Sequence, residues 1–390
     1  MELNRRTALA LSGTAMLQAQ QQVKGAIIGA GGRGRYLTGE FKEIGVEMGA
    51  VCDIYEANLY AGLKVASSSA KAYTDYRRLL DDKSIQVVVI ATPDHWHAKM
   101  AIDAVEAGKD VYVEKPMAHT PEEGFRMIEA VRRTRRVLQV GTQRRSFDLF
   151  LDAKKVMDSG QVGKVRLVNS WWVNRVTSLR KGELQGKLDW NQWLGTAPKR
   201  ELSAERFFNW YWFWDYSGGL MVGQAAHIVD AINWFMGSGY PKAVSCTGTM
   251  SVIGAEVPET TCLSIEYPDY LAVFVLGYQS MRYSGFNDQM KQFHGDKARF
   301  DVARESYALY REDSKATELK PDPYVARPRS FDSATRQHIR NFLDAVKSRK
   351  DPSAPVEAGQ HTNVALCMAM ESLRSGRRVR WNETARRMES

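Results

Sequence analysis

Apolar stretches of strand length alternate with stretches of helical period over the first third of the chain. The strand-like runs cover 23–30, 46–53, 86–92, 110–114 and 137–141. Between them, 97–108 and 121–136 carry apolar residues at helical spacing, and Thr120-Pro121-Glu122-Glu123 is a typical helix start. Alternating elements of this length predict a parallel sheet with right-handed crossovers. We therefore predict an α/β, doubly wound domain over 20–143.

The pattern changes after Gln143, where longer strand-like stretches rich in β-branched and aromatic residues replace the alternation. Gly and Pro separate these stretches, which is typical of a largely antiparallel sheet. We predict a second, α+β domain over 144–390 with a large, mostly antiparallel open sheet. Its expected helices are 146–158, 331–348 and 357–375, and its expected strands are 164–174, 241–252, 260–267, 271–279 and 377–381.

Aromatic residues crowd the segment 203–216. Such density is compatible with a buried core, but Asn209, Asp215 and Gly218-Gly219 favour a loop that presents rings. The aromatic residues are Phe207, Phe208, Trp210, Tyr211, Trp212, Phe213 and Trp214.

The first residues have the features of an export signal. Arg5-Arg6 precede an uncharged stretch from Thr7 to Ala19, and Leu17-Gln18-Ala19 is a suitable cleavage site. We expect residues 1–19 to be a twin-arginine signal peptide and the protein to be periplasmic or otherwise exported. The alternative is a frayed N-terminal helix. No apolar run approaches the ~20 residues that a membrane span needs.

Composition and charge add two limits. The chain has 390 residues and a formal net charge of +9, but its basic residues are scattered. The densest cluster, 132–136, ends a predicted helix, where cations are favoured, so we expect no nucleic-acid partner. The four cysteines form no C-x-x-C pair, and export would permit a disulfide between Cys246 and Cys262.

A glycine fingerprint follows the first predicted strand. Gly29-Ala30-Gly31-Gly32-Arg33-Gly34 opens a helix, and Asp53 ends the next strand, 19 residues after Gly34. Gly29 permits a tight turn, Gly31 lets the backbone approach a pyrophosphate, and Gly34 allows close helix–strand packing. Gly32 and Arg33 lie in the same phosphate-binding turn. The first domain is thus predicted to be a Rossmann domain whose helix N-terminus binds a dinucleotide phosphate.

The choice of dinucleotide follows from Asp53. Its carboxylate can accept hydrogen bonds from a ribose diol and would repel a 2′-phosphate, which favours NAD over NADP. Arg33 and Arg35 weaken this preference. An exported protein cannot draw on the cytoplasmic cofactor pool, so we expect the NAD to be tightly bound.

Several longer motifs carry a resemblance to a known family. They are 76–116, which ends in Glu114-Lys115-Pro116, then 140–145, 188–195 and 215–219. Together they make the chain similar to the glucose–fructose oxidoreductase / inositol dehydrogenase (Gfo/Idh/MocA) family over nearly everything after the leader. The resemblance implies a homodimer or homotetramer formed through the open sheet.

The resemblance places a catalytic lysine at Lys115, in a motif whose Lys-Pro bond is often cis. Burial and a nearby oxidised nicotinamide would both favour the neutral amine, which can take the proton of a sugar hydroxyl. Thr92, Pro93 and His97 follow the preceding strand and, by resemblance, line the nicotinamide half of the cofactor, as does Glu114. His95 and His97 have no accompanying ligand set, so no metal is expected.

The second catalytic motif of the family places an aspartate four residues before a histidine on one helix. Here the histidine is His227, but the position of the aspartate is Gly223. Two interpretations of Gly223 follow. The space that it leaves beside His227 would admit a larger substituent such as an aglycone, or the loss of the carboxylate impairs ordinary dehydrogenase activity. Asp215 could replace the carboxylate, and Asp230 is expected to orient the helix. The expected substrate-contacting residues are Arg144, Trp212, Trp214, Asp215 and Gly223.

Three hypotheses for the function follow. The first is an exported NAD-dependent oxidoreductase that transfers hydride between a sugar or glycoside hydroxyl carbon and its bound cofactor, with Lys115 and His227 as the proton-transfer pair. The second is a redox-neutral glycoside hydrolase that works by oxidation, elimination, hydration and reduction. The third is a non-catalytic, cofactor-bound sugar sensor or scaffold, which only Gly223 supports.

Overall fold

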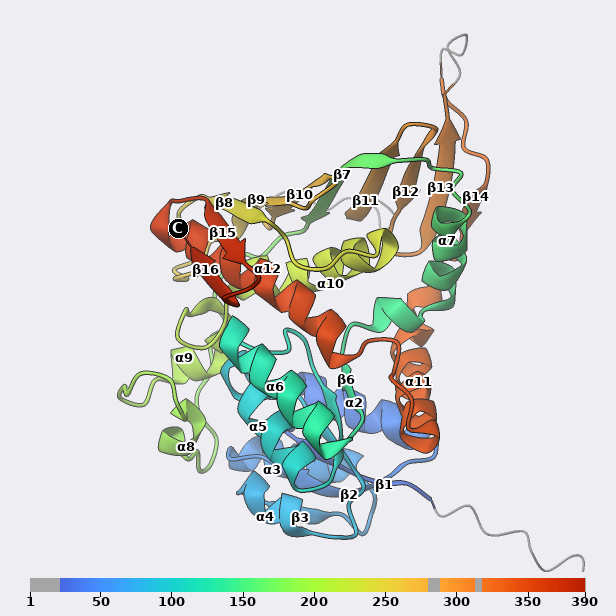
Figure 1. Cartoon of the computed structure of the whole chain (residues 1–390). Helices are drawn as coiled ribbons and strands as arrows, with labels where there is room; N and C mark the ends of the chain where they lie inside the picture. The colour runs from blue at the N-terminus through green and yellow to red at the C-terminus, as the bar shows by residue number, and fades with distance from the viewer. Residues whose placement is uncertain (1–21, 280–287, 313–317, 390) are drawn as a thin grey trace, which may run out of the picture.

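The computed structural model describes residues 22–279, 288–312 and 318–389. The predicted signal peptide, 1–19, lies outside these residues. Figure 1 shows two sheets stacked with helices between and around them. The helices are α2 (Gly32–Glu43), α3 (Glu56–Val65), α4 (Tyr76–Asp81), α5 (Asp94–Glu106), α6 (Pro121–Thr134), α7 (Asp148–Asp158), α8 (Trp190–Leu194), α9 (Ala204–Phe208), α10 (Gly219–Met236), α11 (Ala334–Ser348) and α12 (Val356–Ser375), with short 3₁₀ turns η1 (Gln143–Ser146), η2 (Trp210–Trp212) and η3 (Ser330–Ser333).

The first sheet has six parallel strands in the order β3-β2-β1-β4-β5-β6. Helices α4, α5 and α6 cover one face, and α2, α3 and α11 cover the other. Both faces are buried, which explains why the strands are apolar throughout rather than alternating. The strands are β1 (Lys24–Ile28), β2 (Glu47–Cys52), β3 (Lys71–Tyr73), β4 (Val87–Ile90), β5 (Asp110–Val113) and β6 (Leu138–Val140).

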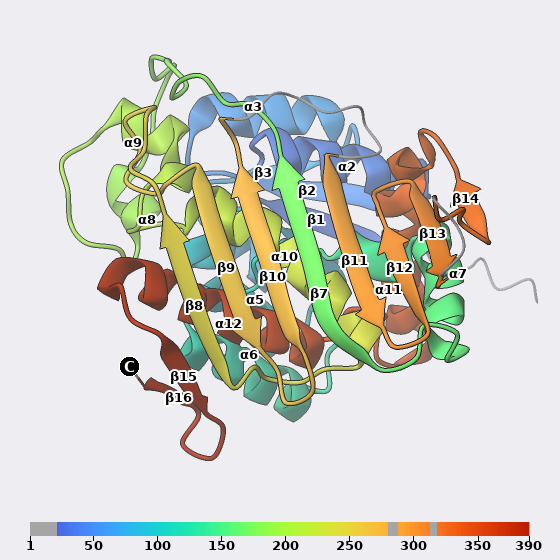
Figure 2. The same cartoon turned by 90° about the horizontal axis from the view of Figure 1, so that it is seen from above.

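The second sheet has ten strands in the order β14-β13-β12-β11-β7-β10-β9-β8-β15-β16, and only the β7–β10 pair is parallel. Helices α10 and α12 lie beneath it (Figure 1), whereas Figure 2 shows no helix over its upper face. The predicted α/β fold with a mostly antiparallel second sheet is thus confirmed. The strands are β7 (Val165–Val173), β8 (Ala243–Gly248), β9 (Thr260–Glu266), β10 (Leu271–Gly277), β11 (Gln289–Gly295), β12 (Ala298–Val302), β13 (Ser306–Arg311), β14 (Tyr324–Ala326), β15 (Val379–Asn382) and β16 (Arg387–Glu389).

The chain leaves the second sheet after β7 and returns at α10, and this excursion (174–218) carries α8, α9 and η2. Its aromatic residues do not form the simple ring-presenting loop that the sequence favoured. Phe207, Phe213 and Tyr216 are buried with Trp190 and Trp193 in a small core of their own. The reason is that rings from separate parts of the excursion pack on one another, as Trp193 and Tyr216 do edge-to-face at 4.6 Å between centroids.

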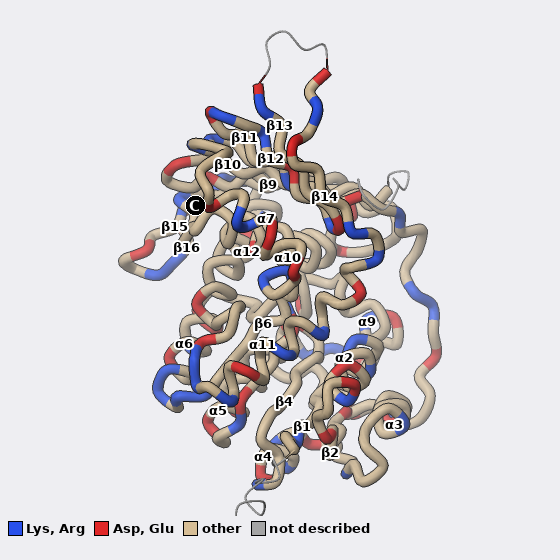
Figure 3. The backbone as a smooth tube through the Cα atoms, turned by 90° about the vertical axis from the view of Figure 1, so that its right-hand side faces the viewer, with Lys and Arg blue, Asp and Glu red and all other residues tan. Residues whose placement is uncertain are grey.

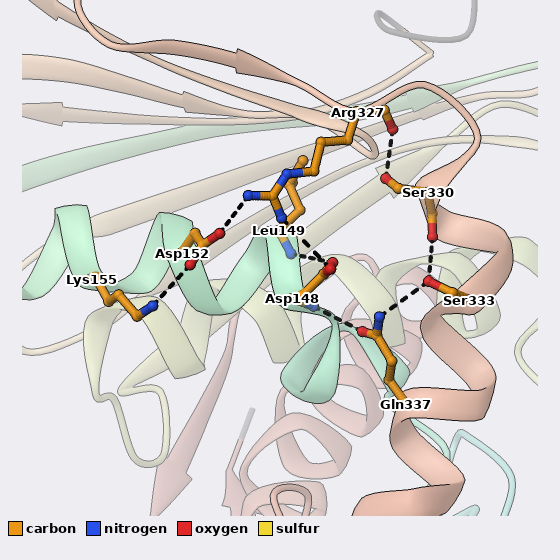
Figure 4. Close-up of polar contacts among 8 residues, drawn as sticks. All are labelled: Asp148, Leu149, Asp152, Lys155, Arg327, Ser330, Ser333 and Gln337. Atoms are coloured by element: carbon orange, nitrogen blue, oxygen red, sulfur yellow. Dashed lines mark hydrogen bonds and ion pairs between the residues drawn. The ribbon is translucent and has the colours of Figure 1, made fainter.

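Helix α11 comes late in the chain but packs on the first sheet. Ile339 and Phe342 share a core with Phe41 and Tyr112. A polar network beside it ties the start of α7 to the segment between β14 and α11 (Figure 4), with Arg327 bonded to Asp152 at 2.6 Å and Gln337 accepting from the Asp148 amide at 2.9 Å. None of the residues in this network lines the cavities described below.

Charged residues of both signs are interspersed along the backbone in Figure 3, and many pair with each other. Arg132, in the basic cluster, binds Asp351 and Glu357. Among the described residues, none of the helices combines the length and apolar character that crossing a membrane requires.

The cysteines whose pairing export would permit are not bonded to each other. Cys246 and Cys262 are free thiols on adjacent strands, and Cys246 is buried while Cys262 is exposed. They face opposite sides of the sheet, because Cys246 pairs with Leu263 and its neighbour Thr247 pairs with Cys262.

Candidate active site

Two adjoining cavities lie at the carboxyl ends of the parallel strands. The larger has a volume of about 500 Å³ and the smaller about 360 Å³. Both are lined by Arg33, Ala91, Thr92 and Trp210, so one elongated ligand could occupy both. This edge of a doubly wound sheet is where ligands are expected.

The glycine fingerprint forms the floor of the larger cavity. A Cβ added to Gly31 or Gly32 would meet no atom within 4 Å, and both glycines line the larger cavity at the start of α2. Gly29 has φ +88° and Gly34 packs so closely that an added Cβ would overlap the Gly29 carbonyl oxygen. The site therefore fits a dinucleotide pyrophosphate at a helix N-terminus.

Asp53 is held at the end of β2 by backbone groups. Its carboxylate accepts from the Ala30 amide at 2.7 Å and from the Tyr55 amide at 2.8 Å. Burial nevertheless raises its pKa to about 6, against those hydrogen bonds and Arg35. Arg33 is bound to Glu114, and Arg35 donates to the Ala30 carbonyl, so both arginines that could have favoured a 2′-phosphate have other partners.

The excursion 174–218 forms the roof of the larger cavity. Six of its residues line this cavity together with the fingerprint and Asp53. Bound nucleotide would thus lie between the two structural units rather than on an open crevice. The roof residues are Arg180, Gln192, Trp193, Phe207, Phe208 and Trp210.

The smaller cavity brings together the predicted catalytic residues. Lys115, after β5, and His227, on α10, both line it, with His97 and Glu114. The Lys115–Pro116 bond is cis, and the Lys115 Nζ donates to the Gly223 carbonyl oxygen at 3.0 Å. Helix α10 and strand β5 are therefore joined at the site through the lysine itself.

The surroundings of Lys115 favour its neutral form. Burial is the main cause and lowers its pKa, opposed by the carboxylates of Glu114 and Asp94. Burial alone would raise the pKa of Glu114, but Arg33 and Lys115 bring it below its usual value. A buried lysine with a lowered pKa can serve as a proton acceptor.

Two residues of the smaller cavity, His227 and Thr92, have unpaired polar atoms. The Nδ1 atom of His227 and the Oγ1 atom of Thr92 are buried without a hydrogen-bond partner among the described residues. Burial lowers the pKa of His227 well below its usual value, helped by Lys115. Unpaired buried polar atoms are costly, and both residues line the smaller cavity, so these atoms are candidates for contact with a ligand.

His97 has a positioning role in this geometry. Its two ring nitrogens lie 2.6 Å from the Pro116 carbonyl oxygen and 2.9 Å from that of Thr92. The imidazole ring thus connects the residues that follow β4 and β5, including Pro116, the next residue after Lys115. Thr92 and Pro93 line the larger cavity.

Three of the predicted substrate-contacting residues, Asp215, Trp212 and Trp214, do not line either cavity. Asp215 does not replace the missing carboxylate, because it is bound to Arg200 at 2.6 Å and Arg206 at 3.3 Å and lines neither cavity. Trp212 and Trp214 also line neither cavity; Trp210 and Tyr211 take that place.

The packing also contradicts two other expectations, a substrate contact for Arg144 and open space beside Gly223. Arg144 is buried and lines neither cavity; it lies over the rings of Trp172 and Phe331 and is bonded to Gln289. The expected room beside Gly223 is absent, because the phenol of Tyr211 occupies it.

Asp94 and Tyr211 are cavity residues that the sequence did not single out. Asp94 is buried, accepts from Ser217 at 2.6 Å and directly follows Thr92-Pro93, a position that could have pointed to it. Tyr211 belongs to the aromatic segment that was expected to present rings to the substrate, but nothing in the sequence distinguished it from Trp212 and Trp214.

Comparison with known proteins agrees with this geometry. A family model described as "Oxidoreductase family, NAD-binding Rossmann fold" matches residues 23–142, and one described as "Oxidoreductase family, C-terminal alpha/beta domain" matches residues 185–381. A solved structure of levoglucosan dehydrogenase, complex with NADH and levoglucosan, superposes with a TM-score of 0.74 at 17% identity, covering 92% of this chain and 99% of that one.

Curated relatives match shorter stretches. Inositol 2-dehydrogenase of Salmonella typhimurium is 37% identical over 134 residues, 34% of this chain and 40% of the relative. Alpha-N-acetylgalactosaminidase of Shewanella oneidensis is 37% identical over 123 residues, 29% of this chain and 27% of the relative. The alignments thus cover less than half the length of each relative.

Proposed function

Because the chain belongs to the Gfo/Idh/MocA oxidoreductase family and carries its NAD-binding Rossmann domain, we propose that it oxidises a hydroxyl of a sugar, glycoside or related polyol. The observation that carries this proposal is the position of Lys115 and His227 on a cavity that adjoins the dinucleotide site. Bound NAD supplies the oxidising chemistry. The named sugar substrates of relatives support this class of substrate without identifying the individual compound.

Lys115 accepts the proton of the reacting hydroxyl in this proposal. Its neutral form is favoured by burial, and the Gly223 carbonyl orients the amine. His227 is neutral and offers an unpaired Nδ1 as a second contact for a substrate oxygen. General acid–base groups held in this way typically contribute about 10²–10⁴-fold to a rate.

Tight retention of NAD is part of the same proposal. The roof over the larger cavity buries the ligand between two structural units and supports slow release. Retention suits export, which we propose on the basis of the Arg5-Arg6 signal.

A homo-oligomer is also proposed. Leu271 and Val275 on β10 are 36% and 41% exposed, on the sheet face that no helix covers. Exposed apolar side chains on an open sheet favour association with a second copy.

A second candidate function is redox-neutral glycoside cleavage. The similarity to the Shewanella alpha-N-acetylgalactosaminidase favours it. A cycle that restores the cofactor would also suit an exported protein with retained NAD. Lys115 would have the same proton-accepting role in either reaction.

A sugar and glycoside panel separates these functions. Protein purified without added cofactor is expected to contain NAD by mass spectrometry and to show reduced-nicotinamide absorbance when myo-inositol, levoglucosan or another polyol is added. Release of nitrophenol from aryl glycosides without added cofactor would instead indicate the hydrolase. Any measurable turnover excludes the non-catalytic sensor, whereas no response across a broad panel contradicts both enzymatic proposals.

Binding of NAD is expected to weaken in acid. Only the ionised Asp53 accepts hydrogen bonds from both ribose hydroxyls, and its pKa of about 6 means that protonation removes this form as the pH falls. Affinity measured by calorimetry on protein freed of cofactor should therefore fall by about tenfold from pH 7 to pH 5. Asp53→Asn should bind NAD weakly at every pH, without the decrease in acid. A wild-type affinity for NAD that does not change over this pH range would refute the role of the Asp53 carboxylate.

A further inference from the structure

The space beside Gly223 is filled by a phenol from another part of the chain. A Cβ built on Gly223 would overlap the Tyr211 hydroxyl oxygen and would lie 2.5 Å from Cζ and 2.8 Å from Cε2. Tyr211 belongs to η2 in the excursion, and Gly223 lies on α10. Glycine at 223 is thus required by the tyrosine, because any side chain there would displace the ring.

The Tyr211 phenol lies among the groups that handle the proton. It lines the smaller cavity with Lys115, Asp94 and His227. The Lys115 Nζ contacts the Gly223 carbonyl oxygen at 3.0 Å, so the lysine and the phenol approach the same turn of α10. His227 follows Gly223 by one helical turn on the same face.

The chemistry of a phenol here differs from that of a carboxylate. An ionised carboxylate only accepts hydrogen bonds, whereas a neutral phenol both donates and accepts. Burial and the nearby Asp94 raise the pKa of Tyr211 well above its usual value, so the group stays neutral and keeps its proton. It can therefore donate to a substrate oxygen and does not repel one that carries negative charge.

We propose that Tyr211 is a substrate-binding residue whose hydroxyl donates a hydrogen bond to an acceptor oxygen of the substrate, in the space that a side chain at 223 would otherwise take. The inference rests on the proposed function and extends it. The favoured substrate presents an acceptor oxygen, such as a ring, glycosidic or carbonyl oxygen, beside the hydroxyl that Lys115 deprotonates.

The phenol oxygen can be removed without changing the packing. Tyr211→Phe is expected to lower kcat/KM for the best sugar by about 10–100-fold, with NAD content and melting temperature unchanged. Tyr240→Phe is the matched control, because Tyr240 packs against His361 and Trp381 away from both cavities, and it should behave as wild type.

Changing the side-chain volumes at positions 211 and 223 together provides a second measurement. Gly223→Asp alone should lower the melting temperature, because its side chain collides with Tyr211. Tyr211→Ala combined with Gly223→Asp should relieve the collision and regain melting temperature relative to Gly223→Asp.

The outcomes separate this inference from the function on which it rests. Tyr211→Phe within about twofold of wild type, with Tyr211→Ala inactive, would show that the ring only fills space and would overturn the proposal. If the double variant melts at no higher temperature than Gly223→Asp, then Tyr211 does not fill the space beside Gly223, and the proposal is overturned. A wild type that turns over no sugar or glycoside refutes the proposed function itself, and this inference with it.

Discussion

Replacing Lys115 with methionine is expected to reduce turnover by about 10²–10⁴-fold while NAD stays bound. Methionine keeps the length of the side chain but removes the Nζ atom, which donates to the Gly223 carbonyl oxygen. The two carboxylates on the cavity are already engaged, Glu114 by Arg33 and Asp94 by Ser217, so neither is free to replace the amine. The measurement is the single-turnover rate of cofactor reduction with the best sugar, beside the NAD content by mass spectrometry.

The charge of Lys115 can be separated from its proton transfer. Lys115→Arg keeps a cation and hydrogen-bond donors, but a guanidinium does not release its proton in this pH range, so activity should stay low. In wild type the rate should rise with pH through a pKa below the usual lysine value, because burial lowers it. Lys99→Ala, on the exposed side of α5, is the control and should be fully active. Near-wild-type activity of Lys115→Arg would contradict the proton-accepting role.

Removing Arg145 should cost about 3–5 kcal/mol of unfolding free energy. Arg145 Nε bonds to both carboxylate oxygens of Asp230 at 2.9 and 3.0 Å, and the side chains are only 9% and 1% exposed. Arg145→Ala leaves that carboxylate buried without its counterion. Asp230 lies three residues after His227 on α10, so we expect the pair to orient this helix as well, which is the role predicted for Asp230 from the sequence.

Denaturant unfolding measures this effect. Arg378→Ala is the matched control, because Arg378 pairs with Glu266 on the surface, where such pairs are worth about 0–1 kcal/mol. Arg145→Met with Asp230→Leu should recover much of the loss, since neither buried charge remains. An Arg145→Ala variant as stable as Arg378→Ala would show that the buried pair does not hold α10.

Local patterns were sufficient for most elements of the fold. The apolar runs predicted β1, β2, β4, β5 and β6, and the later runs predicted β7 to β10, because burial on one or both faces imposes a period along the chain. The expected strands did not include β11 to β13, nor β3, β14 and β16, which have only three residues each. Few residues carry the period in so short an element, and its partner strand decides whether it forms.

The site was predictable where its residues follow strands directly. Gly29, Asp53, Thr92 and Lys115 all stand at the ends of parallel strands, which meet at one edge of the sheet. Asp215 was misplaced, because its neighbourhood in the sequence says nothing about Arg200 and Arg206, the cations that bind it. The catalytic roles of Lys115 and His227 stay predictions for the variants above.

By itself the sequence determined the doubly wound first domain, the NAD fingerprint, the family and the residues of the lysine motif. These depend on periodicity and on motifs within a few residues, which the chain encodes locally. Only the tertiary structure decided that α11 completes the first core, that the excursion roofs the cofactor cavity and that Tyr211 fills the space at Gly223. The physical reason is that each depends on side-chain volumes from distant segments meeting in one place, and packing, rather than spacing along the chain, determines which of them fit.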